Sequence, residues 1–289
     1  MISPIPLRLA GAEDNHLAAD LWDGHGHPVI FLHGGGQTRR AWDKTAREVA
    51  ENGMRAITVD LRGHGESAWV ASGNYTFSDY AEDVAAIVRQ VEKQFHARPS
   101  NVGASLGGLS SLAAELRHGP LLESLVLVDI TPRMNPEGVA KIQGFMGEKM
   151  EEGFATLEEA ADAIAAYLPH RKRPSSLEGL RKNLRRGDDK RYRWHWDPAL
   201  VRGRNNINLG APELMTELRA ALPRLHIPAL LVRGMQSELV GEEEAREFVE
   251  LAPAASYVDV RGAGHMVAGD RNDVFSQAVL EFLTDRAAA

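Results

Sequence analysis

The order of strand-like and helix-like segments constrains the fold of this chain more than any other feature. Leu125–Val128 is an unbroken apolar run of the kind that a parallel sheet buries on both faces. Further strands are expected at Leu17–Trp22, Val29–Leu32, Arg55–Val59, Ala229–Val232 and Ser256–Val260, and one is expected to end near Val102–Ala104. Helical patterns alternate with them at Trp42–Asn52, Ser78–Phe95, Leu106–Arg117, Glu242–Leu251 and Val274–Leu283. This alternation predicts an α/β fold with right-handed crossovers.

The alternation stops between Thr131 and Pro223, where the sequence contains no convincing buried strand. Helical stretches are expected there at Val139–Met150, Leu157–Tyr167 and Leu177–Arg185, and prolines separate them. We therefore expect one α/β core, formed by residues 1–130 and 224–289. Residues 131–223 would be a helical unit inserted into that core.

Composition excludes several classes of protein. The 289 residues are 44% hydrophobic and 25% charged, as in ordinary globular domains. The absence of cysteine excludes disulfides, thiolate catalysis and Cys-ligated metal sites. No apolar run is long enough to span a bilayer, and the first ten residues lack the pattern of a secretory signal. We expect a cytoplasmic protein that does not bind membranes and is a monomer or homodimer.

Charge is distributed unevenly along the chain. The net charge of −7 argues against general binding to nucleic acid, yet residues 171–193 carry ten Lys and Arg residues against three acidic ones. Such a run is usually a solvated helical face. The alternative is a basic surface that attracts an anionic substrate or partner.

A candidate nucleophile lies in the pattern Gly103-Ala104-Ser105-Leu106-Gly107, between an expected strand and an expected helix. A sharp turn at this point would hold Ser105 in a strained conformation that small neighbours tolerate. The Leu106 amide would lie at a helix N-terminus, where it can stabilise an oxyanion. The competing interpretation is a chance Gly/Ser helix cap.

A serine needs a base, and the base needs a carboxylate to orient it. His265, in Gly262-Ala263-Gly264-His265, follows the last expected strand, so it would lie at the same carboxyl edge of the sheet as Ser105. Two carboxylates are candidates for the acid. Asp129 follows Leu125–Val128 directly, whereas Glu238 comes six residues after Ala229–Val232.

Two glycine-rich segments complete the set of candidate site residues. His33-Gly34-Gly35-Gly36 follows a strand, so the Gly35 amide can be the second oxyanion donor. A phosphate-binding loop is the alternative, but neither of the common nucleotide-binding glycine motifs is present. The segment from Asp60 to Ser67 is interpreted as a tight structural turn, with His64 structural rather than catalytic.

Taken in order, His33–Gly36, Asp60–Ser67, Gly103–Gly108 and Gly264-His265 resemble the α/β-hydrolase superfamily over nearly the whole chain. The resemblance implies a mostly parallel eight-stranded sheet, a nucleophile–acid–histidine triad, and a helical cap in place of the insertion, between the sixth and seventh strands. Most members carry the acid after the seventh strand as Gly-x-x-Asp, where this chain has Ser237 and then Glu238. A minority carry it after the sixth strand, where Asp129 stands. We favour Asp129, and Glu238 stays open.

A serine nucleophile predicts acyl chemistry, because the members that open epoxides or displace halide use aspartate at this position. Ester, lactone, amide or activated carbon–carbon bonds of a small, partly apolar molecule fit such a site, and no metal or organic cofactor is needed. Two alternatives are a cofactor-free oxygenase or perhydrolase and a non-catalytic, receptor-like binding protein. Candidates to line an apolar pocket with a basic approach are Phe145, Met146, Met150, Phe154, Tyr167, Trp194, Trp196 and Met215.

Overall fold

An eight-stranded sheet organises the protein. The computed structural model describes residues 2–167, 177–265 and 272–287. The strand order is β1-β2-β4-β3-β5-β6-β9-β10. The β1–β2 and β2–β4 pairs are antiparallel, and the other neighbours are parallel. The strands are β1 (Ile5–Ala10), β2 (His16–Asp23), β3 (Pro28–Leu32), β4 (Arg55–Val59), β5 (Ser100–Ala104), β6 (Leu125–Val128), β9 (Ala229–Gly234) and β10 (Ala255–Val260). The predicted α/β fold and mostly parallel sheet are confirmed.

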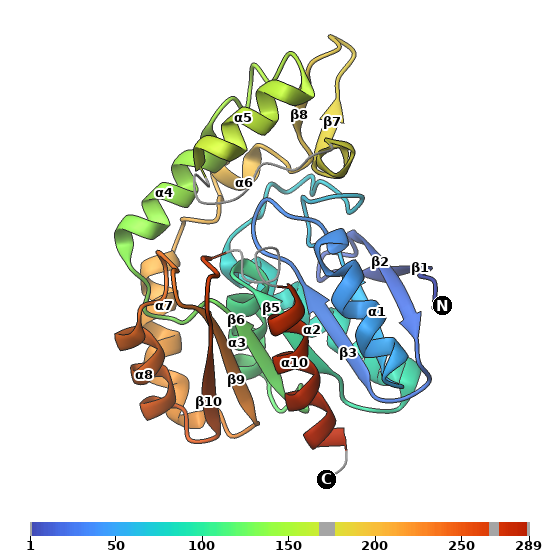
Figure 1. The fold of residues 1–289 in the computed structure, drawn as a ribbon, viewed down its shortest axis with the longest axis vertical. Helices are drawn as coiled ribbons and strands as arrows, with labels where there is room; N and C mark the ends of the chain where they lie inside the picture. Colours follow the sequence, from blue (N-terminus) through green and yellow to red (C-terminus); the bar gives the residue numbers. More distant parts are fainter. Residues whose placement is uncertain (1, 168–176, 266–271, 288–289) are drawn as a thin grey trace.

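Helices cover both faces of this sheet (Figure 1). They are α1 (Asp43–Glu51), which follows the 3-10 helix η1 (Arg39–Trp42), α2 (Phe77–Phe95), α3 (Leu106–His118), α8 (Glu242–Leu251) and α10 (Asn272–Ala287). Alternate residues of β6 face opposite sides of the sheet. Leu125 and Leu127 pack in the core with α2 and α3, whereas Val126 and Val128 pack in the core with α1 and α10. Burial on both faces explains why β6 is apolar throughout.

A second group of elements lies over one end of the sheet (Figure 1). It contains α4 (Pro136–Gly147), α5 (Leu157–Tyr167), the 3-10 helix η2 (Glu178–Asn183), the hairpin β7 (Leu184–Arg186) and β8 (Tyr192–Trp194), and α6 (Ala199–Arg202). We call the elements from α4 to α6 the cap. The prediction of a helix over Leu177–Arg185 is wrong, because a 3-10 helix there leads into the hairpin instead. A tight turn at Gly187–Lys190, with a left-handed φ of 64° at Lys190, closes that hairpin.

The structure adds α7 (Ala211–Ala221), followed by the 3-10 turn η3 (Leu222–Arg224). From the sequence, these residues were expected to belong to the helical inserted unit, and no particular helix was assigned to them. In the structure α7 packs against α2 and α3, in the helical layer beside the sheet. Pro212 stands in the first turn of α7, where a missing N–H leaves no hydrogen bond unmade.

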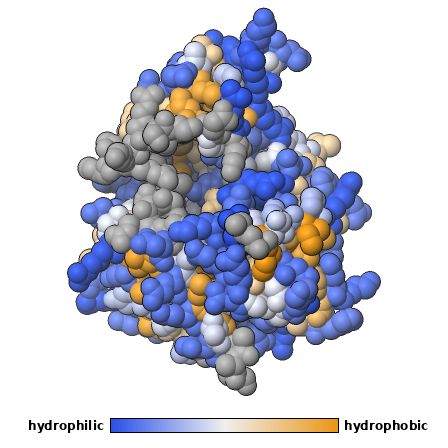
Figure 2. Space-filling model, turned by 45° about the vertical axis from the view of Figure 1, so that its right-hand side comes forward, coloured by the Kyte–Doolittle hydropathy of each residue, from blue (hydrophilic) through white to orange (hydrophobic). Residues whose placement is uncertain are grey.

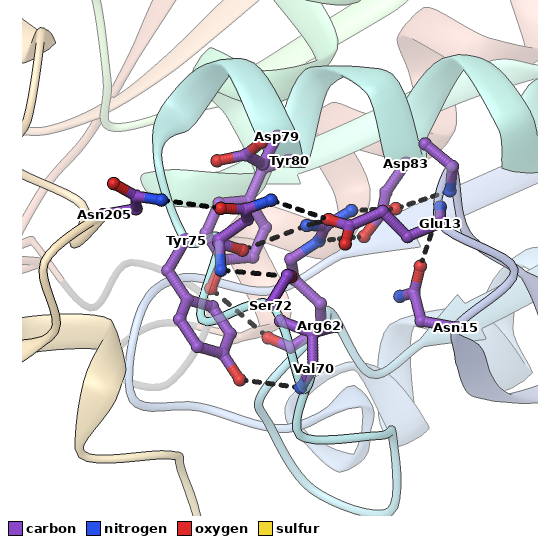
Figure 3. A network of polar contacts seen from close by, with 12 residues as sticks. Glu13, Asn15, Arg62, Val70, Ser72, Tyr75, Asp79, Tyr80, Asp83 and Asn205 are labelled. Carbon is purple, nitrogen blue, oxygen red and sulfur yellow. Dashed lines mark hydrogen bonds and ion pairs between the residues drawn. The ribbon is translucent and has the colours of Figure 1, made fainter.

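A buried ion-pair network fixes the turn that follows β4 (Figure 3). Arg62 donates to both carboxylate oxygens of Asp83 at 2.6 Å, to Glu13 at 2.8 Å and to the Asn74 carbonyl at 3.0 Å. The side chains of Arg62 and Asp83 are 1% and 0% exposed. Burial alone would lower the pKa of Arg62, but the hydrogen bonds and charges of Asp83 and Glu13 outweigh it and raise that pKa. The turn is therefore tied to α2 and to the β1–β2 loop.

The face of the protein shown in Figure 2 is mostly hydrophilic, and hydrophobic residues show there in a few small groups. Among the described residues, the large hydrophobic side chains that are most exposed are Ile5, Trp69, Leu209, Met235 and Val274. They come from separate elements and loops. No helix in the described part of the chain has the length and apolar character needed to cross a bilayer.

Candidate active site

Ser105 occupies the sharp turn between β5 and α3. Its backbone is left-handed, with φ 45° and ψ −111°, and for a residue other than glycine such a conformation is strained. The neighbouring glycines are required by close packing. A Cβ on Gly103 would lie 2.6 Å from the Gly108 nitrogen, and one on Gly107 would lie 2.5 Å from the Leu32 carbonyl oxygen. The predicted strand–turn–helix context of Ser105 is present.

The register of the sheet places Asp129, a candidate acid, beside Ser105. Ala104 of β5 pairs with Val128 of β6, so Ser105 and Asp129 each stand one step beyond a paired residue. Val128 pairs in turn with Val232 of β9, two residues before Gly234. Asp129 also has a left-handed backbone, with φ 50°, and its side chain is fully buried.

His265 reaches Asp129 from the loop that follows β10. Its Nδ1 lies 2.8 Å from Asp129 Oδ2, and the imidazole is 10% exposed. The second carboxylate oxygen of Asp129 accepts the Gly234 amide at 2.9 Å. Because a carboxylate can only accept, Nδ1 carries the proton of a neutral imidazole, and its Nε2 keeps a lone pair.

The structure separates the two candidate acids. Glu238 lies 3.6 Å from the Lys141 ammonium of α4, and no contact between Glu238 and His265 exists among those described. The preceding residue, Ser237, donates its hydroxyl to Asp129 Oδ2 at 2.5 Å. Sequence reasoning missed this contact. The only signal for it was that Ser237 stands where many relatives carry the acid.

The glycine-rich loop after β3 lies against Ser105. A Cβ on Gly34 would lie 3.3 Å from the Ser105 Cβ, and the Gly107 amide donates to the His33 carbonyl at 3.2 Å. The Gly34 amide donates to Gln37 and the Gly36 amide donates to His64. Neither the Gly35 amide nor the Leu106 amide has an acceptor among the described residues. These two N–H groups are the ones predicted to stabilise an oxyanion.

Three buried histidines hold the loops around this glycine-rich segment. Through a ring nitrogen, His33 accepts the Leu61 amide at 3.0 Å, His64 accepts the Gly36 amide at 3.1 Å, and His195 of the cap accepts the Gly65 amide at 2.8 Å. Burial lowers the pKa of each of these histidines to about 3. All three are therefore neutral at physiological pH and serve as fixed acceptors. His64, which was interpreted as structural, is buried within the turn.

Side chains of the cap cover the glycine-rich loop. The Trp196 ring comes within 3.1 Å of the Cβ position of Gly36, and the Met146 side chain within 3.6 Å of that of Gly35. Trp196 stacks on Trp194 with ring centroids 5.0 Å apart, and Phe145 meets Trp194 edge to face at 5.5 Å. The space above Gly35 is therefore bounded by apolar side chains.

The other predicted pocket residues lie farther into the cap or outside it. Phe145 stacks on Tyr167 at 4.3 Å, and Phe154 packs edge to face on Trp194 at 5.1 Å. Met150 is buried, in the loop after α4. Met215 lies on α7, in the layer against α2 and α3.

The basic run holds the cap together. Arg185 donates to the Gly65 carbonyl and lies over the Trp69 ring at 5.0 Å, which ties the cap to the core. Arg191 and Arg193 bind carbonyl groups of the loop between α4 and α5. Arg193 also pairs with Asp189 at 2.7 Å. Residues 171–176 of the run lie outside the described residues.

A model of the α/β-hydrolase fold family matches residues 27–271. The chain belongs to the α/β-hydrolase family. It is 31% identical to esterase Rv0045c of Mycobacterium tuberculosis over 93% of this chain and 87% of that protein. It is 28% identical to 2-(acetamidomethylene)succinate hydrolase of Mesorhizobium japonicum over 91% of this chain and 88% of that protein. This α/β hydrolase is therefore an enzyme of the hydrolase class.

Solved structures show the same fold. The structure of an E-2-(acetamidomethylene)succinate hydrolase superposes with a TM-score of 0.83 at 23% identity, covering 98% of this chain and all of the other. The structure of the Mycobacterium tuberculosis esterase superposes with a TM-score of 0.75 at 30% identity, covering 97% of this chain and 92% of the other.

Proposed function

We propose that this α/β hydrolase is a serine hydrolase that works through an acyl-enzyme. Ser105 Oγ attacks the carbonyl carbon of the substrate, and His265 Nε2 takes the hydroxyl proton. The amides of Leu106 and Gly35 stabilise the oxyanion of the tetrahedral intermediate. His265 then gives the proton to the leaving group. Water, deprotonated by His265, attacks the ester on Ser105, and His265 returns the proton to Ser105 Oγ as the acid is released.

The hydrogen bond from His265 Nδ1 to Asp129 is the observation that supports this function most strongly. It fixes the tautomer in which Nε2 is free to act as a base, and the buried carboxylate stabilises the imidazolium that forms. The strained turn at Ser105 and the amides of Gly35 and Leu106 lie at the same edge of the sheet. A binding protein without turnover would have no need for this combination.

We further propose a small, partly apolar substrate with an ester, lactone, amide or activated carbon–carbon bond. Met146 and Trp196 cover the glycine-rich loop with apolar side chains, which supports an acyl group of limited size. Relatives named as an esterase and as a hydrolase of a substituted succinate support hydrolysis of small acyl compounds. Binding of such a molecule needs no partner macromolecule.

Hydrolysis of 4-nitrophenyl acetate and butyrate tests this function. The wild-type protein is expected to release a burst of one nitrophenol per chain before the steady state, because the acyl-enzyme forms before water attacks it. Ser105→Ala should lose the burst and lower kcat by about 10⁵-fold or more. Ser256→Ala, on the exposed face of β10, is the matched control and should keep both.

Other outcomes would favour the alternatives. Oxygen consumption or a requirement for peroxide would indicate an oxygenase or a perhydrolase. Tight binding of an ester without any release of nitrophenol would indicate a receptor-like protein. A Ser105→Ala variant that turns over at the wild-type rate would contradict the proposed role of Ser105.

A further inference from the structure

The other contacts of the Ser237 hydroxyl determine that it donates its proton to Asp129. Its oxygen accepts the amides of Leu239 at 3.0 Å and Val240 at 3.2 Å, so both of its lone pairs are used. The single remaining group is the hydroxyl proton, and the nearest acceptor is Asp129 Oδ2 at 2.5 Å. The direction of this hydrogen bond is therefore fixed: Ser237 donates and Asp129 accepts.

Among the described residues, three hydrogen-bond donors reach the Asp129 carboxylate. It receives the Gly234 amide on Oδ1, and Ser237 and His265 on Oδ2. The carboxylate is fully buried, so no exposed oxygen can take water in place of a lost partner. A hydroxyl donor stabilises the negative charge and restricts the rotation of the carboxylate toward His265.

The loop that carries Ser237 is joined to the loop that carries His265. The Met235 amide donates to the Val260 carbonyl at 3.1 Å, and the Gln236 amide donates to the Ala263 carbonyl at 2.9 Å. The turn that carries Ser237 is therefore bonded to Asp129, after β6, and to the loop after β10. A change at the Ser237 hydroxyl acts on the acid and the base together.

We propose that Ser237 is a positioning residue for the triad, holding the charge and orientation of Asp129 without touching the substrate. This inference rests on the proposed function. Two amides already point at the oxygen of position 237, so this position can hold a carboxylate when residue 129 carries an amide that donates to it in place of the native carboxylate.

The first test compares Ser237→Ala with Ser237→Thr, using the hydrolysis of 4-nitrophenyl acetate. Ser237→Ala should lower kcat by about 10-fold with KM unchanged. The acid limb of the kcat/KM profile should shift as well, because the carboxylate that faces the imidazole has lost a donor. Ser237→Thr restores the hydroxyl at this half-buried position and should recover most of the rate.

The second test moves the acid. When Asp129→Asn is combined with Ser237→Asp, the new amide at position 129 can donate to the new carboxylate at position 237. This arrangement reverses the native hydrogen bond while the net charge is kept. The double variant is expected to be at least about 10-fold faster than Asp129→Asn alone. Asp129→Asn combined with Ser237→Asn carries no charge at either position and is the matched control, with no recovery expected.

The outcomes separate the inference from the proposed function. If Asp129→Asn is impaired while Ser237→Ala keeps the wild-type kcat and pH profile, the role of Ser237 is overturned and the triad stands. If the folded double variant with a carboxylate at position 237 is no faster than its control with an amide there, that position does not support a carboxylate toward His265. A Ser105→Ala or Asp129→Asn variant with wild-type activity overturns the proposed function itself. Circular dichroism and thermal melting of every variant establish that each one is folded.

Discussion

Asp129→Asn is expected to lower kcat for ester hydrolysis by about 10⁴-fold, because an amide in place of the carboxylate favours the wrong tautomer of His265. The buried carboxylate lies 2.8 Å from His265 Nδ1, and its side chain is 0% exposed. An Asn side chain can turn its NH₂ group toward Nδ1, which would then have to give up its proton. Steady-state kinetics with 4-nitrophenyl acetate at pH 8 measure the loss.

Glu238→Gln is the control, because it removes the other candidate acid. Glu238 faces Lys141 on α4 at 3.6 Å and is partly exposed, so its neutralisation should change kcat by less than about 3-fold. The reverse pattern, with Glu238→Gln inactive and Asp129→Asn near the wild-type rate, would transfer the acid role to Glu238.

Arg62→Met is expected to lower the free energy of unfolding by about 3–5 kcal/mol, the cost of leaving a buried charge without its partner. Asp83 is 0% exposed, and both of its oxygens bind Arg62 (Figure 3). The Asn74 carbonyl and Glu13 lose a donor as well. Urea unfolding at pH 7, followed by circular dichroism, measures the change.

Two further variants identify the cause of that loss. Arg117→Met breaks an ion pair with Glu217 in which both side chains are partly exposed, so it should cost less than about 1 kcal/mol. Adding Asp83→Asn to Arg62→Met removes the unpaired charge and should recover part of the stability. Equal losses in Arg62→Met and Arg117→Met would mean that the buried network contributes little.

The buried strands were predictable because burial requires apolar residues, and these form recognisable runs in the sequence. The bounds of β4, β6 and α8 agree with the predicted Arg55–Val59, Leu125–Val128 and Glu242–Leu251. The missed elements are ones in which this apolar signal is weak or a proline interrupts it. β1 is an edge strand with several exposed residues, and the proline of α7 signalled a break although it stands in the first helical turn.

The candidate site was predictable where local sequence fixes local structure. The glycines around Ser105 are such signals because close packing requires them, and Gly262, before His265, is one because its φ of 72° is left-handed. The choice between Asp129 and Glu238 depends instead on the register of β6 against β9 and on how one loop turns. The contact from Ser237 to Asp129 joins residues 108 positions apart, and no local pattern encodes it.

Mass spectrometry of the intact protein after treatment with a fluorophosphonate tests the central claim most directly, because these probes react with serines that a base has activated. The account predicts one covalent adduct per chain on wild-type protein, located on Ser105, and none on Ser105→Ala. A folded wild-type protein that remains unlabelled, or that is labelled equally in the Ser105→Ala variant, would contradict an activated nucleophile at Ser105.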